Sequence, residues 1–529
     1  MTRPAAGRLT AVGAICLLLA FGGWALSSPV GSSPDEDFHL ASIWCAWGER
    51  TGLCEPGDTS TTRRVPAQFP STVHCYAFDP EQSAACQPDL TVGPLVETDR
   101  GNFAGPHPPV YYWFAGLFAS HSIAGTVLVL RVLNAALYLG LLTAVYLLVS
   151  PGLRRAMVLG ALVTAVPLGL FVVGSVNPSA WALISAATLL VSVVGYLTTE
   201  DRRRRIALGV IAAISLVMAA GAQADAAAYS VIAIAVALIL TWRGRDNPWT
   251  RLAYPVVLAV AGGAAFLLAG QSSVADPDGT TQPVSFARFV RVVIDIPALW
   301  SGAMGGPHPK HDLGENGPWG LGWLDTAVPA VVWVGVWGIF CAVLSLAMAH
   351  AQRRRILAVT LVGLAVLLIP TYLQVVSGSP VGSLVQPRSV LPLLTLLVIT
   401  ALIRVDGQAF RLNRAQRVIV VAVLAIGNAA ALYANLRRYV TGNDVLSWNL
   451  DRDVEWWWSI PLSPLALWLL TVAAFGVGAV LVTSELATDA AADDAPVWPT
   501  KPRAGQPASR PETPTTAAPT TGAPSSATG

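Results

Sequence analysis

The sequence predicts an all-helical, polytopic membrane protein with about twelve transmembrane helices, and two observations support this fold class. Hydrophobic residues make up 54% of the 529 residues and charged residues only 12%, whereas a soluble domain is about one-quarter charged. The apolar residues also gather in stretches of about 20, the length that a helix needs to cross a hydrocarbon core about 30 Å thick.

The apolar stretches define the domain organisation. Residues 1–482 are expected to form the transmembrane domain, and the tail 483–529, rich in Ala, Pro, Thr, Ser and Gly, to be disordered and cytoplasmic. The first stretch has a basic start but no clear cleavage site, so we expect a retained helix. The twelve stretches lie near 9–29, 124–149, 156–174, 179–198, 206–224, 226–242, 252–270, 324–349, 356–376, 389–404, 418–436 and 462–482.

The positions of the basic residues predict the orientation in the membrane. Cytoplasmic loops carry an excess of Arg and Lys, and every second loop of the twelve-helix arrangement is basic. Both termini are therefore expected in the cytoplasm of a cell with an inner or plasma membrane. These loops hold 18 of the 33 basic residues, namely Arg3, Arg8, Arg154, Arg155, Arg202 to Arg205, Arg243, Arg245, Arg251, Arg353 to Arg355, Arg404, Arg411, Arg414 and Arg417.

Three long segments, 30–123, 271–323 and 437–461, are expected on the outer side. The first of them contains four cysteines, and an oxidising compartment favours two disulfides there. Four cysteines allow three pairings, and short loops close at the lowest entropic cost. We therefore favour Cys45–Cys54 and Cys75–Cys86, with Cys16 and Cys341 free. The cysteine spacings match no zinc pattern.

An acidic motif follows the first predicted helix, in the stretch Ser33 to His39. Asp35, Glu36 and Asp37 are followed closely by His39, and such carboxylates can act as a general base or hold a divalent cation. The alternative is a solvated turn, in which Pro34 opens a short helix and the carboxylates favour its positive N-terminal end.

Other polar residues lie at the outer ends of the predicted helices. Arg131 and Asn134 are one helical turn apart and share a face of the second predicted helix. A charged side chain inside a transmembrane helix usually faces a cavity or a partner. Each residue alone could be an interfacial anchor, whereas together they indicate a polar cavity with Arg side chains suited to a phosphate. The others are Asn177, Gln223, Asp225, Gln386, Arg388, Arg437 and Arg438.

Four stretches resemble a large family of bacterial membrane proteins of unknown function that is common in actinobacteria. Residues 33–39 are similar to its Pro-Asp-Glu-x-x-His signature. The stretches HisProProValTyrTyrTrp (107–113), GlyLeuGlyTrpLeuAspThrAlaValPro (320–329) and ValGlnProArgSerValLeuProLeu (385–393) also look like that family. The last departs from the family pattern, which usually has an aromatic residue where Ser389 stands.

That family is itself similar to the GT-C glycosyltransferases, which carry an acidic motif in the first outer loop and use lipid-phosphate-linked sugars. The resemblance implies a GT-C-like fold in which Asp35 is the catalytic base and Glu36 its neighbour in the site. Substrate-binding roles are then expected for His39, Arg131, Asn134, Asp225, Gln386 and Arg388, and the arginines, with Arg437 or Arg438 as further candidates, would hold a polyprenyl phosphate.

The implied activity is transfer of a sugar from a polyprenyl-phosphate donor to a glycan or lipid acceptor of the cell envelope. No Walker loop or Rossmann glycine pattern is present, which argues against a cytoplasmic nucleotide site. No nucleic-acid partner is expected, and a divalent cation stays open as a cofactor although no spacing indicates it. Two alternatives remain: a transporter or flippase of envelope precursors, and a non-catalytic envelope assembly protein.

Overall fold

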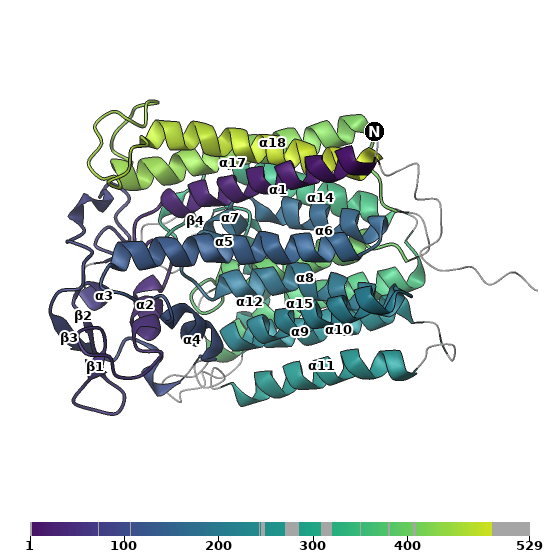
Figure 1. Ribbon diagram of the computed structural model, residues 1–529, viewed down its shortest axis with the longest axis horizontal. Coiled ribbons are helices and arrows are strands. Elements are labelled where there is room, and N and C mark those ends of the chain that lie inside the picture. Colours follow the sequence, from purple (N-terminus) through teal and green to yellow (C-terminus); the bar gives the residue numbers. More distant parts are fainter. Residues whose placement is uncertain are drawn as a thin grey trace, which may run out of the picture.

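The computed structural model is mostly helical, in agreement with the predicted class. It describes residues 3–71, 73–105, 107–242, 244, 249–269, 285–307, 320–349, 351–378, 381–405 and 409–488. Long helices run side by side along the molecule and form one bundle (Figure 1). In chain order they are α1 (Arg3–Leu26), α5 (Ile123–Leu148), α6 (Pro151–Ala165), α7 (Leu168–Val173), α8 (Ser179–Thr198), α9 (Arg202–Ala222), α10 (Ala224–Thr241), α11 (Trp249–Leu268), α14 (Ala330–Met348), α15 (Arg353–Ser377), α16 (Pro387–Leu402), α17 (Arg414–Val440) and α18 (Pro464–Thr488).

Nine helices in the described part of the chain are long and apolar enough to cross a membrane. They are α5, α8, α9, α10, α11, α14, α15, α17 and α18, while α16 and the part of α1 from Ala11 to Leu26 are apolar but shorter. The predicted stretch 156–174 is divided into α6 and α7, with Pro167 in the break between them. Each of the twelve predicted stretches thus contains helix, and the predicted stretches 206–224 and 226–242 are divided at Gln223.

Close packing between α1 and α18 depends on small residues. A Cβ atom at Gly23 of α1 would lie 1.9 Å from the hydroxyl oxygen of Thr471 on α18, so only glycine fits there. Such close approach of backbones is the usual means of helix association in lipid. Lipid tails are as apolar as the helix surfaces, so no hydrophobic force drives the helices together and close packing is needed instead. The helix α18 continues to Thr488, so the first residues of the predicted tail, 483–488, are helical; residues 489–529 lie outside the described residues.

The first long segment folds into small elements between α1 and α5. Strands β1, β2 and β3 form an antiparallel sheet in that order, with Val65 of β2 opposite Val96 of β3. The elements are α2 (Glu36–Trp44), β1 (Glu55–Pro56), β2 (Arg63–Pro66), α3 (Gln68–Ser71), η1 (Ala84–Cys86), β3 (Leu95–Thr98), η2 (Asn102–Ala104) and α4 (Val110–Gly116). Later segments add α12 (Phe286–Asp295), α13 (Pro297–Gly302) and the hairpin β4 (Gly320–Leu321) and β5 (Thr326–Ala327).

Both predicted disulfides are confirmed. Cys45 is bonded to Cys54 and Cys75 to Cys86, with Cα atoms 5.3 and 6.1 Å apart, and Cys16 and Cys341 are free. Each bridge closes a short loop within the first long segment, as the entropic argument for neighbouring pairs requires.

The loops gather at one end of the bundle, opposite the N-terminus (Figure 1). We call the described residues of 27–122, 320–329 and 441–463 the loop cluster. Its parts contact one another: Trp323 donates a hydrogen bond to the carbonyl of Gly31, and Ser83 donates one to Glu455. The helices α9 and α17, which end at the loop cluster, begin with Arg202 and Arg414 at the other end of the bundle. Both arginines therefore lie at the end of the bundle opposite the loop cluster.

Candidate functional site

The acidic motif begins with an unusual turn at Asp35. This residue has φ 61° and ψ 16°, in the left-handed region that non-glycine residues seldom adopt, and it immediately precedes α2. Its side chain makes no capping hydrogen bond, whereas Glu36 closes the turn by accepting a hydrogen bond of 2.9 Å from the backbone N–H of Ser33. Asp35 is therefore not a helix-capping residue, and its carboxylate faces elsewhere.

The carboxylate of Asp35 pairs with two arginines that are far away in the sequence. Nη2 of Arg388, in the first turn of α16, donates to Oδ2 at 2.6 Å, and Nη2 of Arg100 lies 3.5 Å from Oδ1. Nη1 of Arg388 also donates to the carbonyl of Pro34 at 3.1 Å. Burial, the largest single influence, would raise the pKa of Asp35, but the positive groups around it, Arg388 first among them, together outweigh it, so the pKa lies below its usual value.

Arg100 links two carboxylates of the motif. Its Nε and Nη2 donate to Asp37, with Nη2 3.0 Å from Oδ1, and Nη2 also reaches Asp35. The Asp37 side chain is 1% exposed, whereas Arg100 is 43% exposed. The hydrogen bonds to Asp37 raise the pKa of Arg100, because they favour its charged form. The sequence offered no signal for Arg100, which stands in an ordinary polar loop.

Glu36 and Arg131 form a fully buried ion pair. Nη2 of Arg131 lies 3.3 Å from Oε1 of Glu36, and both side chains are 0% exposed. Burial raises the pKa of Glu36, although Arg131 opposes this effect. Arg131 further donates to the carbonyls of Ala25, Ser28 and Pro29 at 3.0, 2.6 and 2.6 Å. Arg131 thus holds the end of α1 and the motif against α5, and its terminal nitrogens are occupied.

His39 lies one turn into α2 and is buried. Its Nδ1 is 3.0 Å from the hydroxyl of Tyr112, a residue of α4 within the second resembling stretch. Burial lowers the pKa of His39 to about 3, so its ring is neutral near neutral pH. The ring of Phe38 contacts the rings of both His39 and His107, with centroid distances of 5.6 and 5.3 Å. The stretch 107–113 is therefore brought to the acidic motif.

Two asparagines fix the helix ends beneath the motif. Asn134 donates to the carbonyl of Ser175 and accepts a hydrogen bond from Trp181, so it ties α5 to the start of α8. Asn177 donates to the hydroxyl of Ser33 at 3.2 Å and to the carbonyl of Pro34 at 3.1 Å. The hydrogen bonds of both side-chain amides hold the helix ends and the motif in position, and neither amide faces the solvent-exposed side of the Asp35 carboxylate.

Of the remaining predicted residues, Asp225 interacts electrostatically with Arg388, the partner of Asp35. Asp225 is in the first turn of α10 and accepts a hydrogen bond of 2.8 Å from the N–H of Ala226. Gln386 precedes α16 without a side-chain capping bond, and its buried Oε1 has no hydrogen-bond partner among the described residues.

Arg437 and Arg438, near the end of α17, donate hydrogen bonds to residues of the loop cluster. Arg438 is buried, forms a 2.9 Å ion pair with Asp325, and donates to the carbonyls of Tyr76 and Gln82. Arg437 donates to the carbonyls of Ser447 and Asn449. Arg438 therefore fixes the Cys75–Cys86 loop against α17. Asp325 lies in the third resembling stretch, but its sequence position alone did not indicate this pairing.

Among the described residues, no group of three or more His, Cys, Asp or Glu side chains could hold a metal ion.

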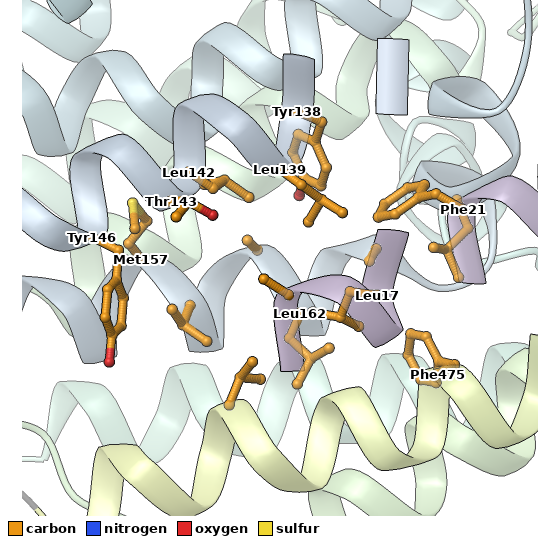
Figure 2. A pocket seen from close by; sticks show the side chains of 16 residues that line it. Leu17, Phe21, Tyr138, Leu139, Leu142, Thr143, Tyr146, Met157, Leu162 and Phe475 are labelled. Atoms are coloured by element: carbon orange, nitrogen blue, oxygen red, sulfur yellow. The ribbon is translucent and has the colours of Figure 1, made fainter. Parts of the chain in front are cut away.

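An apolar cavity of about 90 Å³ lies within the bundle (Figure 2). Leu17 and Phe21 of α1, Tyr138 of α5, Met157 of α6 and Phe475 of α18 are among its lining residues. None of the charged residues around Asp35 lines it.

The fold and the site define a multi-spanning helical membrane protein with a charged cluster at one end of its bundle. Residues 18–433 match the family described as "Predicted membrane protein (DUF2142)", and the chain belongs to this family. No curated protein matches the chain. The matched range includes the acidic motif and Arg388, so the cluster lies within the part shared with the family.

Proposed function

We propose that the protein is a GT-C-type membrane glycosyltransferase, which moves a sugar from a polyprenyl-phosphate donor to a cell-envelope acceptor. In this proposal α1, the α6–α7 pair and α16 cross the membrane together with the nine longer helices, which gives about twelve crossings. The loop cluster then faces the outside of the plasma membrane, and both termini are cytoplasmic.

One observation carries the proposal: Asp35 precedes a helix without capping it and pairs with Arg388 of another helix. A residue needed only for the helix start would accept a hydrogen bond from the first turn. A left-handed conformation at a non-glycine residue is a cost that recurs at functional sites. The side chain is 42% exposed, so a substrate can reach the carboxylate.

The chemistry assigned to these residues is a displacement at the anomeric carbon. Asp35 accepts the proton of an acceptor hydroxyl as that oxygen forms its bond to the anomeric carbon. The bond from this carbon to the phosphate oxygen breaks, and the polyprenyl phosphate leaves with the electron pair. Arg388 and Arg100 balance the negative charge of the phosphate, for which planar guanidinium groups are well suited.

A lipid-borne donor is supported by two further features. The sequence has no nucleotide-binding motif, and the apolar cavity is lined by helices α1, α5, α6, α7 and α18 at membrane depth, where a hydrocarbon chain is the available ligand. Within the proposal, Arg131 positions Glu36 and the motif and does not bind the phosphate itself, because its terminal nitrogens are already occupied.

The test is glycan and lipid-linked-sugar analysis of a deletion strain. We expect the strain to lack one envelope sugar and to accumulate its polyprenyl-phosphate form. The wild-type gene should restore the sugar, whereas Asp35→Asn should not. The control is Asp89→Asn, an exposed residue of the same long segment. An unchanged glycan and lipid profile in the deletion strain would contradict the proposal.

A further inference from the structure

We propose that an incoming phosphate takes Arg388 away from Asp35, so that binding of the donor is the event that frees the carboxylate to act as a base. This inference rests on the proposed function and concerns how its site is controlled. Around Asp35, two carboxylates and two guanidinium groups pair with one another and balance in charge. They belong to Asp35, Asp37, Arg100 and Arg388.

In the absence of substrate, the proposed base and the proposed phosphate ligand neutralise each other. Arg388 donates to Asp35 at 2.6 Å, so an anion that uses this guanidinium must compete with the carboxylate. Arg131 and Arg438 do not offer an alternative, because both are fully buried and donate to backbone carbonyls and a carboxylate. A phosphate that binds Arg388 must therefore change the Asp35–Arg388 contact.

The geometry indicates which arginine changes partner. Arg100 is held by the buried carboxylate of Asp37 through two nitrogens, so it is fixed where it stands. Arg388 is 14% exposed and makes one hydrogen bond to Asp35 and one to the carbonyl of Pro34. It can keep the carbonyl contact and exchange a carboxylate oxygen for a phosphate oxygen, since both are anionic acceptors.

The exchange has a consequence for the base. Arg388 is the main cause that keeps the pKa of Asp35 below its usual value, against the effect of burial. When a phosphate neutralises Arg388, this stabilisation of the carboxylate is lost and its affinity for a proton rises. Asp35 is thus a weak base without the donor and a stronger one with it, which favours binding of the donor before proton transfer.

Binding measurements on the full chain in detergent micelles test this coupling. The probe is farnesyl phosphate, with inorganic phosphate as a separate arm that distinguishes a lipid phosphate from the free ion. Because Asp35 competes for Arg388, Asp35→Asn should bind farnesyl phosphate more tightly than wild type, by roughly 3- to 30-fold for a charge-assisted contact. Arg388→Ala should weaken binding, and the double variant should bind like Arg388→Ala.

The variants and controls keep the outcomes separate. Asn adopts the left-handed conformation more readily than most residues, so Asp35→Asn is expected to fold, and Asp35→Ser provides a second neutral side chain. Asp89→Asn should bind as wild type does. Equal or weaker binding by both neutral variants at Asp35 would overturn the coupling, and loss of sugar transfer in the same variants would leave the proposed function standing. Tighter binding together with intact sugar transfer would support the exchange and overturn the proposed base.

Discussion

The substitution Arg131→Met tests the role of the buried ion pair most sharply. Met has similar length and no charge, so it removes the guanidinium while filling much of its space. Glu36 would then be a buried carboxylate without its cation, and the carbonyls of Ala25, Ser28 and Pro29 would lose a donor. Removing one partner of a buried pair costs about 3–5 kcal/mol.

Thermal unfolding of the purified protein in detergent measures this effect. For a chain of this size, such a loss lowers the apparent melting temperature by about 3–5 °C. Adding Glu36→Gln removes the unpaired charge, so the double variant should regain about 1–3 kcal/mol relative to Arg131→Met. The control is Arg251→Met, which breaks an exposed pair with Glu200 and should cost less than about 1 kcal/mol.

Three results would refute the reasoning about Arg131. A melting temperature of Arg131→Met equal to that of the Arg251→Met control would show that the pair does not hold the motif. Strictly additive losses in the double variant would show that Glu36 and Arg131 do not interact. A stable Arg131→Met protein with lost affinity for farnesyl phosphate would return Arg131 to the role of a phosphate ligand.

Three further predictions concern the loop cluster and α2. Replacing Cys75 and Cys86 by Ser should lower the free energy of unfolding by about 3 kcal/mol, from the length of the closed loop, in chemical denaturation. Arg438→Met should cost about 3–5 kcal/mol, because Asp325 loses its buried partner, and Asp325→Asn in addition should recover part of the melting temperature. Lowering the pH from 6.5 to 5 should destabilise wild type by about 2 kcal/mol more than His39→Gln. Burial depresses the pKa of His39, so its protonation favours the unfolded chain. Equal pH slopes of the two proteins in thermal unfolding would refute this.

The apolar stretches and the cysteines were predictable because each depends on local sequence. A stretch of about 20 apolar residues has few alternatives to a helix in lipid, where backbone groups must be satisfied internally. The pairing of Cys45 with Cys54 follows from the short loop between them. The break that divides the predicted stretch 156–174 falls at Pro167, but hydrophobicity alone did not show it.

The partners of the charged residues could not be predicted in the same way. The sequence indicated that Arg131 and Arg388 lie near the acidic motif, yet one is enclosed by backbone carbonyls and the other reaches Asp35. Which acceptor an arginine finds depends on where the chain turns after α1, and this is decided by tertiary packing. Arg100 and Asp325 stand in polar loops, where a charged residue is ordinary until its partner is known.

The most direct test of the proposed function is sugar transfer by membranes that contain the protein. A labelled sugar on polyprenyl phosphate is supplied to membranes of the deletion strain that carry wild type, Asp35→Asn or the Asp89→Asn control at equal levels. We predict that wild type and the control incorporate label into envelope material, and that Asp35→Asn is slower by about 10²–10⁴-fold, the usual contribution of a general base. Incorporation by Asp35→Asn at the wild-type rate would contradict the assignment of Asp35 as the catalytic base.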